Sequence, residues 1–330
     1  MMKSIGRLLA LALVVAVAWL VWVIAVPVEL PHTPYNITVG PNRTLAQVSR
    51  ALEDEGVIRN RRVMVVLARL GGYDRRLKAG LYRFNGPVSL WTILQRFAQG
   101  RPDEASVTVI EGWTFRQFRE VVDQDPDLQH VTAGWSDAQI LSEIGASETQ
   151  AEGLFFPSTY YFNPESTDLE LYQRAYRTMR QHVDAAWQQR VAGDALKSPY
   201  ELLVLASLIE KETSRDEDRP LVAAVFRNRL QSGMRLQTDP SVIYGMGAAY
   251  RGRIGKADLR RDTPYNTYTR NGLTPTPISL PGKASLQAAA QPADSKVLYF
   301  VASGDGRSQF SETLQQHNSA VRKFILKKAN

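Results

Sequence analysis

The chain has 330 residues, a formal net charge of +7 and no cysteine. The lack of cysteine excludes disulfides, thiolate nucleophiles, cysteine zinc sites and iron–sulfur clusters. Basic residues are scattered among acidic ones and form no stripe interleaved with aromatic rings, so the charge pattern argues against nucleic acid as a partner. An anionic polymer or a lipid surface fits it better.

The N-terminus carries one long apolar segment, Leu8–Val26, of nineteen residues. At about 1.5 Å per residue, a helix of this length matches a bilayer core about 30 Å thick. Lys3 and Arg7 precede the segment and Glu29 follows it, so the positive-inside rule leaves the N-terminus in the cytoplasm. A cleaved signal peptide is the alternative, although its apolar region is usually shorter, about 7 to 15 residues. We therefore expect a single-pass protein of the cell inner membrane with a periplasmic C-terminal part.

The chain divides into five parts, and the expected fold class is α+β. The parts are a cytoplasmic N-terminus at 1–7, a transmembrane helix at 8–28, a stiff proline-rich spacer at 29–34, a small α+β module at 35–100 and a larger mixed α+β domain at 101–330. A polar break at 100–104 separates the last two. Strands and helices do not alternate regularly in the larger domain, which argues against a doubly wound parallel sheet.

The small module combines short strands with helices. Tyr35–Val39 and Leu81–Phe84 have strand patterns, and Val57–Ile58 looks extended. Thr44 and Ser89 are candidate N-caps, because each precedes a run whose apolar residues recur at helical spacing.

In the larger domain, the strongest helix signal begins at Ser198, the expected N-cap, followed by Pro199 and by Glu201 as the partner of a capping box. The helix is apolar almost all round from residue 202 to 209, so we expect it to be buried. It ends in Glu210 and Glu212. A carboxyl at the end of a buried helix has its protonated form favoured, which suits a general acid. The helical wheel does not decide between the two glutamates, and a solvated last turn is the alternative.

Two later stretches, residues 234–245 and 263–268, mix amide, hydroxyl, carboxylate and aromatic side chains in turn-prone settings. This mixture can hydrogen-bond and stack on sugars. Ordinary loops with packed tyrosine rings are the alternative.

Four motifs follow one another along the larger domain. They are LASLIEKET at 205–213, LQTDPSVIYG at 236–245, PYNTY at 264–268 and LYFVA at 298–302. Together they resemble the YceG-like family of endolytic murein transglycosylases. The resemblance extends from the membrane anchor to the C-terminus, and the 35–100 module resembles the family's LysM-like subdomain.

The resemblance implies a lytic transglycosylase, a lyase that cleaves peptidoglycan glycan strands internally between N-acetylmuramic acid and N-acetylglucosamine. The product carries a 1,6-anhydromuramyl end instead of an added water. A single carboxylic acid suffices without a cofactor if the sugar's own C6 hydroxyl attacks, whereas an ordinary glycosidase needs two carboxylates. The implied role is termination of nascent strand elongation, with peptidoglycan synthases as possible partners.

The resemblance assigns the catalytic acid and base to Glu210, the first glutamate of its motif. Gln237, Asp239, Asn266 and Tyr268 are then expected to hold the sugars and brace Glu210, and Glu212 is a further candidate for substrate binding.

Two stretches depart from the family pattern. Ser308 stands where the family commonly has histidine, and Gly272–Ile278 reads GLTPTPI where the family has GLPPGPI. A role that this histidine has in the family is therefore not carried over to Ser308, and the second change is expected to alter a loop.

Other chemistries lack their sequence signatures. The four histidines, His32, His130, His182 and His317, are isolated and form no metal-ligand pair. No Gly-x-Ser-x-Gly elbow indicates a serine hydrolase. The serious alternative is a non-catalytic, membrane-tethered peptidoglycan-binding scaffold for wall synthases, which has no need for an acid at the end of an apolar helix.

Overall fold

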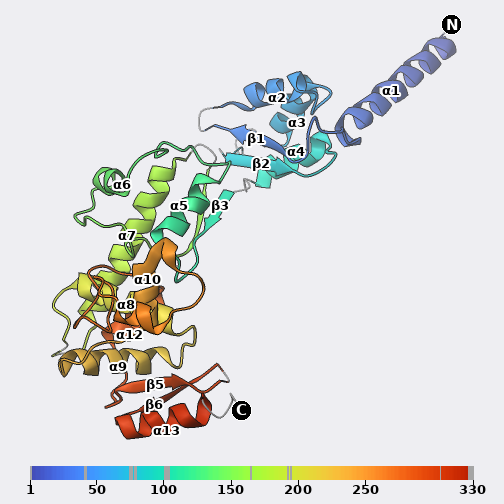
Figure 1. The fold of residues 1–330 in the computed structure, drawn as a ribbon. Helices are drawn as coiled ribbons and strands as arrows, with labels where there is room; N and C mark the ends of the chain where they lie inside the picture. Colours follow the sequence, from blue (N-terminus) through green and yellow to red (C-terminus); the bar gives the residue numbers. More distant parts are fainter. Residues whose placement is uncertain are drawn as a thin grey trace. The chain divides into compact units, whose positions relative to one another are not determined.

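A computed structural model describes residues 2–40, 43–73, 77, 80–99, 105–163, 166–191, 193, 195–304 and 306–325. It divides the chain into two compact units (Figure 1). The first comprises residues 1–106 with 161–166, and the second comprises 107–160 with 167–330. The polar break expected at 100–104 lies outside the described residues.

The first unit begins with a long apolar helix and continues as a small α+β module. Its elements are α1 (Met2–Ala25), β1 (Tyr35–Val39), α2 (Leu45–Asp54), α3 (Arg61–Leu70), β2 (Gly80–Phe84) and α4 (Leu90–Gln99). Within α1, Gly6–Ala25 is long and apolar enough to cross a membrane. β1 and β2 pair antiparallel, with Tyr35 opposite Phe84.

Local chemistry explains where the helices of the module begin. Thr44 caps α2 through a capping box with Gln47, and the Ser89 hydroxyl accepts the N–H of Thr92 at 3.1 Å, so both predicted N-caps are confirmed. The prediction that Val57–Ile58 is extended is wrong. Both N–H groups donate to the carbonyl of Leu52, at 2.8 and 3.2 Å, and fold this stretch into the turn that closes α2.

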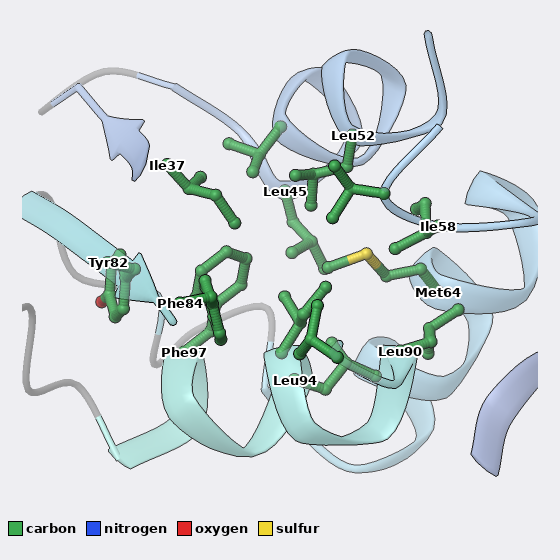
Figure 2. Close-up of a cluster of buried hydrophobic side chains, with 14 of the residues drawn as sticks. Ile37, Leu45, Leu52, Ile58, Met64, Tyr82, Phe84, Leu90, Leu94 and Phe97 are labelled. Atoms are coloured by element: carbon green, nitrogen blue, oxygen red, sulfur yellow. The ribbon is translucent and has the colours of Figure 1, made fainter. Parts of the chain in front are cut away.

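Apolar side chains from α2, α3, α4 and both strands converge in one core (Figure 2). Met64, Ile93 and Leu94 are fully buried in it. Val23 of α1 belongs to the same core and is only 2% exposed. The last turns of the long apolar helix are therefore packed into the module.

The chain after α1 also lies on the module. The guanidinium of Arg59 stacks over the Trp22 ring at 4.4 Å and donates to the carbonyls of Val26 and Pro27. Val28 pairs with Val88, and Leu30, in the segment expected to be a spacer, packs against the core.

The second unit is mostly helical and contains two short pairs of strands. Its elements are β3 (Ala105–Thr108), α5 (Phe115–Asp123), α6 (Asp137–Glu143), β4 (Thr159–Phe162), α7 (Asp168–Gln188), α8 (Pro199–Glu212), α9 (Arg219–Gln231), α10 (Asp239–Met246), a 3-10 turn (Gly247–Ala249), α11 (Lys256–Arg260), α12 (Lys283–Ala290), β5 (Tyr299–Ala302), β6 (Ser308–Ser311) and α13 (Leu314–Phe324). β3 pairs with β4, and the boundary between the two units falls within both strands. β5 pairs antiparallel with β6. The mixed α+β fold class is thus confirmed.

The centre of the second unit is α8. Its residues Leu202–Ile209 are all buried, as the all-round apolar pattern predicts. The helix contacts α7, α9, α10 and α12, so its direction and its C-terminal end are fixed by packing on several sides.

The buried carboxyl of Asp168, the first residue of α7, is expected to stabilise the folded protein. It is fully buried, and its carboxyl accepts the N–H groups of Val131, Thr132 and Leu169 and the hydroxyl of Thr132. We expect Asp168→Ala to lower the free energy of unfolding by about 2–3 kcal/mol, because it leaves buried donors without an acceptor. Thermal unfolding followed by circular dichroism measures this.

The matched control is Asp184→Ala on the exposed side of the same helix. It should stay within about 0.5 kcal/mol of the wild type. Equal stability of the two variants would contradict the role given to Asp168.

Candidate active site

The helix that carries the candidate acid begins as the sequence predicts. The Ser198 hydroxyl accepts the N–H of Glu201 at 3.2 Å, and Pro199 is the first helical residue. The predicted capping box does not close on Ser198, because the Glu201 carboxyl accepts the N–H of Lys197 instead, at 2.6 Å. Both contacts secure the first turn of α8.

Glu210 lies at the other end of α8, and its side chain is only 6% exposed. One carboxyl oxygen accepts the backbone N–H of Gly282 at 2.9 Å. The other lies 3.6 Å from the guanidinium of Arg219, which is also buried. A carboxyl with a fixed N–H and a fixed cation has a defined direction, as a group that transfers a proton requires.

A second carboxyl, that of Glu111, lies next to this group. It lies so close to Gly282 that a Cβ at that position would overlap it. Burial raises the pKa of Glu111, and the charge of Glu210 raises it further, while Arg219 acts in the opposite direction. Glu111, Glu210 and Arg219 thus form one electrostatic cluster around Gly282.

Buried hydrogen bonds bring these distant segments to α8. The Ser207 hydroxyl accepts the N–H of Ile278 at 3.0 Å, and the Ser279 hydroxyl donates to the Ser207 carbonyl. Leu280 then pairs with the turn after Glu111, donating to the carbonyl of Trp113 and accepting the N–H of Gly112. The positions of Glu111 and Gly282 therefore depend on the middle of α8.

Glu212 occupies a different environment at the end of the same helix. The hydroxyl of Thr238 donates to its carboxyl. Burial raises the pKa of Glu212 to about 7, and the neighbouring carboxylate of Asp239 acts in the same direction. Thr238 is itself fixed, because its N–H donates to the Thr267 hydroxyl at 3.0 Å. Glu212 is thus fixed to Thr238, and Thr238 in turn joins the two polar stretches that the sequence singles out.

The remaining predicted residues belong to these stretches. Tyr268 donates its hydroxyl to Asp239 at 2.5 Å. Asn266 is buried, and its amide nitrogen donates to the carbonyls of residues 258, 259 and 261, so it shapes its own loop. Gln237 is exposed and has φ 49°, an unusual conformation for a residue with a side chain. The structure groups these three residues and Asp239 with Glu212, whereas the contacts of Glu210 are to Gly282 and Arg219.

In the part of the chain that the structure describes, no group of three or more histidine, aspartate or glutamate side chains could hold a metal ion.

The sequence pattern of the YceG-like family matches residues 37–323. The chain belongs to this family.

Relatives within the family carry informative names. A Bacillus subtilis (strain 168) protein named endolytic murein transglycosylase is 31% identical over 320 residues, covering 92% of this chain and 88% of that one. A protein of the same name from Streptococcus pneumoniae serotype 2 is 27% identical over 339 residues, covering 92% of this chain and 61% of that one. The crystal structure of a yceG-like protein from Listeria monocytogenes matches with a TM-score of 0.55 and 28% identity, covering 87% of this chain and 98% of that one.

The structure places both departures from the YceG-like pattern. Ser308 donates its backbone N–H to the carboxyl of Asp218 at 3.1 Å, a contact that a histidine at this position could make equally well. Thr276, in place of a glycine, shares a 2.9 Å hydrogen bond between its hydroxyl and that of Tyr265. The second change therefore adds a polar brace to a tyrosine side chain.

Sequence reasoning missed Glu111, Arg219 and Gly282 as members of the site. The sequence pattern gives none of the three a role. Each acquires its role only through contacts with residues far away in the chain. Such positions can be found by comparing related sequences, if the glycine and the two charged residues are the same in all of them.

The pKa of Glu212 gives a prediction for stability. In an unfolded chain a glutamate titrates near 4.3, so the raised value in the folded protein means that the fold favours the protonated form. Its stabilising contribution is fully present below about pH 4.3 and is lost as the pH rises to about 7. We expect Glu212→Gln to remove this loss, of the order of 3 kcal/mol, from the pH dependence of unfolding.

Denaturant unfolding at several pH values between about 4 and 8 provides the measurement. Glu217→Gln, at a side chain 75% exposed, is the control and should leave the curve unchanged. If the pH dependence of unfolding is the same for Glu212→Gln as for this control, the fold does not favour the protonated form of Glu212.

Proposed function

We propose that this protein is a membrane-anchored endolytic lytic transglycosylase of peptidoglycan. The observation that carries the proposal is the buried Glu210 carboxyl, held by Gly282 and Arg219. It lies in a chain that matches, over 92% of its length, a Bacillus subtilis protein named endolytic murein transglycosylase. The bond cleaved is the β-1,4 link from N-acetylmuramic acid to N-acetylglucosamine within a glycan strand.

Glu210 acts as acid and then as base in this proposal. Its proton passes to the glycosidic oxygen as the bond to the muramyl C1 breaks. The C6 hydroxyl of the same muramyl residue then attacks C1 and gives its proton to the Glu210 carboxylate, which closes the 1,6-anhydro ring and restores the acid. No water is consumed, and the second carboxylate of an ordinary glycosidase is not needed as a nucleophile.

Glu111 supports this proton cycle. Burial raises the pKa of Glu111, and the charge of Glu210 raises it further, so a protonated Glu111 can lie beside the Glu210 carboxylate without adding a second negative charge. Arg219 stabilises the carboxylate that remains after the proton has left.

The predicted binding residues have two roles in the proposal. Gln237, Asp239 and Tyr268 contact the sugars, because Gln237 and Asp239 are exposed and Tyr268 holds Asp239. Glu212 and Asn266 brace the loops that carry them.

Mass spectrometry of the products tests the function. Wild-type protein incubated with peptidoglycan should release fragments with 1,6-anhydromuramyl ends, and Glu210→Gln should lower kcat by at least about a thousandfold, because the amide has no proton to give. Glu217→Gln, with an exposed side chain, should retain full activity.

Other products would change the assignment. Reducing ends from the wild type would mean hydrolysis, and a second carboxylate would have to activate water. No cleavage by a folded, wall-binding protein would favour the scaffold. Equal activity of the wild type and Glu210→Gln would remove Glu210 from the mechanism.

The location follows from the N-terminal helix. We place α1 across the inner membrane with residues 1–7 in the cytoplasm and both units in the periplasm. Because Val23 is buried in the module and Arg59 covers Trp22, the module lies directly at the outer surface of that membrane. This position suits an enzyme that ends nascent glycan strands beside the membrane-bound synthases.

The module from 35 to 100 is proposed to be LysM-like. In support, β1, α2, α3 and β2 follow one another in the order strand, helix, helix, strand, and the two strands pair antiparallel. The larger domain then spans 101–330, with the spacer at 29–34 linking α1 to β1.

The absence of cysteine makes the topology easy to measure. In spheroplasts, a membrane-impermeant maleimide should label Leu70→Cys, whose native side chain is 81% exposed, and should spare Ser4→Cys until the cells are lysed. Labelling of Ser4→Cys in intact spheroplasts would reverse the orientation. A mature chain that lacks its N-terminal residues would instead indicate a cleaved signal peptide.

A further inference from the structure

A pocket of about 700 Å³ opens in the second unit beside the end of α8. Three tyrosines line it, Tyr244, Tyr250 and Tyr265, together with Glu152; we call it the tyrosine pocket. Lys211, the residue after Glu210, is also in its lining and donates to the carbonyl of Gly112 at 3.1 Å. The pocket therefore adjoins the turn that carries Glu111.

Glu152 is the chemically unusual group of the tyrosine pocket. One of its oxygens accepts the N–H of Phe115 at 2.9 Å, and the other accepts the hydroxyl of Tyr244 at 3.2 Å. Burial raises the pKa of Glu152 to about 7, and the carboxylate of Asp137 acts in the same direction. At neutral pH this carboxyl can both donate and accept hydrogen bonds.

A purely structural role does not account for a carboxyl at this position. The first turn of α5 already has its capping box, in which the Thr114 hydroxyl accepts the N–H of Gln117. A glutamine at 152 could keep both contacts without the cost of burying an acid, because its oxygen accepts the N–H of Phe115 and its amide nitrogen donates to the hydroxyl of Tyr244. An acid of perturbed pKa in a pocket wall is instead characteristic of a ligand site.

The tyrosine rings are held in fixed positions. Tyr244 and Tyr265 pack edge to face, with ring centroids 4.9 Å apart. The hydroxyl of Tyr265 is braced by Thr276, and that of Tyr244 by Glu152. Rigid aromatic faces beside a few directed polar groups match the two sides of a sugar ring, which has an apolar C–H face and polar edges.

We propose that the tyrosine pocket is a saccharide subsite that holds an N-acetylhexosamine of the glycan strand next to the bond cleaved at Glu210. The tyrosine rings stack on the sugar face, and the Glu152 carboxyl hydrogen-bonds a hydroxyl or the acetamide group. The inference rests on the proposed function and adds a substrate-binding residue to it. Glu152 contacts the sugar but transfers no proton in the reaction, so its loss weakens binding more than chemistry.

The test separates KM from kcat for the full-length, detergent-solubilised protein. The substrate is a set of peptide-free glycan strands, prepared from peptidoglycan with an amidase. Glu152→Ala and Tyr250→Ala should each raise KM about tenfold while kcat stays within about threefold of the wild type. Glu152→Gln should raise KM less, because its amide can keep both contacts, with the Tyr244 hydroxyl as acceptor instead of donor.

Glu143→Gln is the matched control, since Glu143 is exposed at the end of α6 in the same unit. It should leave both constants unchanged. Circular dichroism and the unfolding temperature establish that each variant is folded. If Glu152→Ala does not fold, Glu152→Gln and Tyr250→Ala decide the matter, because neither removes the contacts of Phe115.

The outcomes also show whether the subsite proposal or the proposed function is at fault. Unchanged KM in folded Glu152→Gln and Tyr250→Ala would overturn the subsite, and so would a loss confined to kcat. A wild type that cleaves no strands would contradict the proposed function. Calorimetric binding of the same strands would then test the pocket alone, with weaker binding by both variants supporting it and equal binding overturning it.

Discussion

The burial of α8 is the constraint on which the rest of the second unit depends. Eight consecutive residues of this helix are buried, so it can lie only in the centre of the unit, and its C-terminal turn cannot shift without disturbing four neighbouring helices. That turn carries Glu210 and Glu212. The apolar packing of the helix thus fixes the positions of its two carboxyl groups, and the hydrogen bonds of Ser207 fix the segments that meet them.

The buried carboxyls of this region differ because their partners differ. Glu212 has a hydroxyl donor and a nearby carboxylate, and burial raises its pKa to about 7. Glu210 instead meets a guanidinium and a backbone N–H. Glu152 has two hydrogen-bond donors at the wall of a pocket. The roles that we propose for the three carboxyls, a brace, an acid in a charged cluster and a ligand contact, therefore differ according to which group lies within hydrogen-bonding distance.

The sequence predicts well what is determined locally. The caps at Thr44, Ser89 and Ser198 depend on residues within three positions, and the burial of α8 depends on a pattern within the helix. The prediction for Val57–Ile58 was wrong because two β-branched residues in a row are typical of a strand, whereas here they lie in the turn that closes α2. Glu111 and Glu152 could not be found in this way. Glu152 is 37 residues from Phe115, Glu111 is far from Gly282 in the chain, and pattern reasoning does not bring such segments together. The motif resemblance selected Glu210, whereas the helical wheel alone left it equal to Glu212.

The backbone at Gln237 connects this architecture to the substrate binding that we propose. A left-handed conformation costs a residue with a side chain about 1–2 kcal/mol, and a glycine would adopt it without that cost. The neighbouring contacts hold it in place, because its N–H donates to the carbonyl of Thr267 and Thr238 is fixed to Glu212. Such strain persists where the surrounding structure over-determines it, and it is frequent at ligand sites. The strained backbone of Gln237 presents its amide to solvent. We therefore propose that Gln237 contacts the sugar and that Glu212 holds the loop in position.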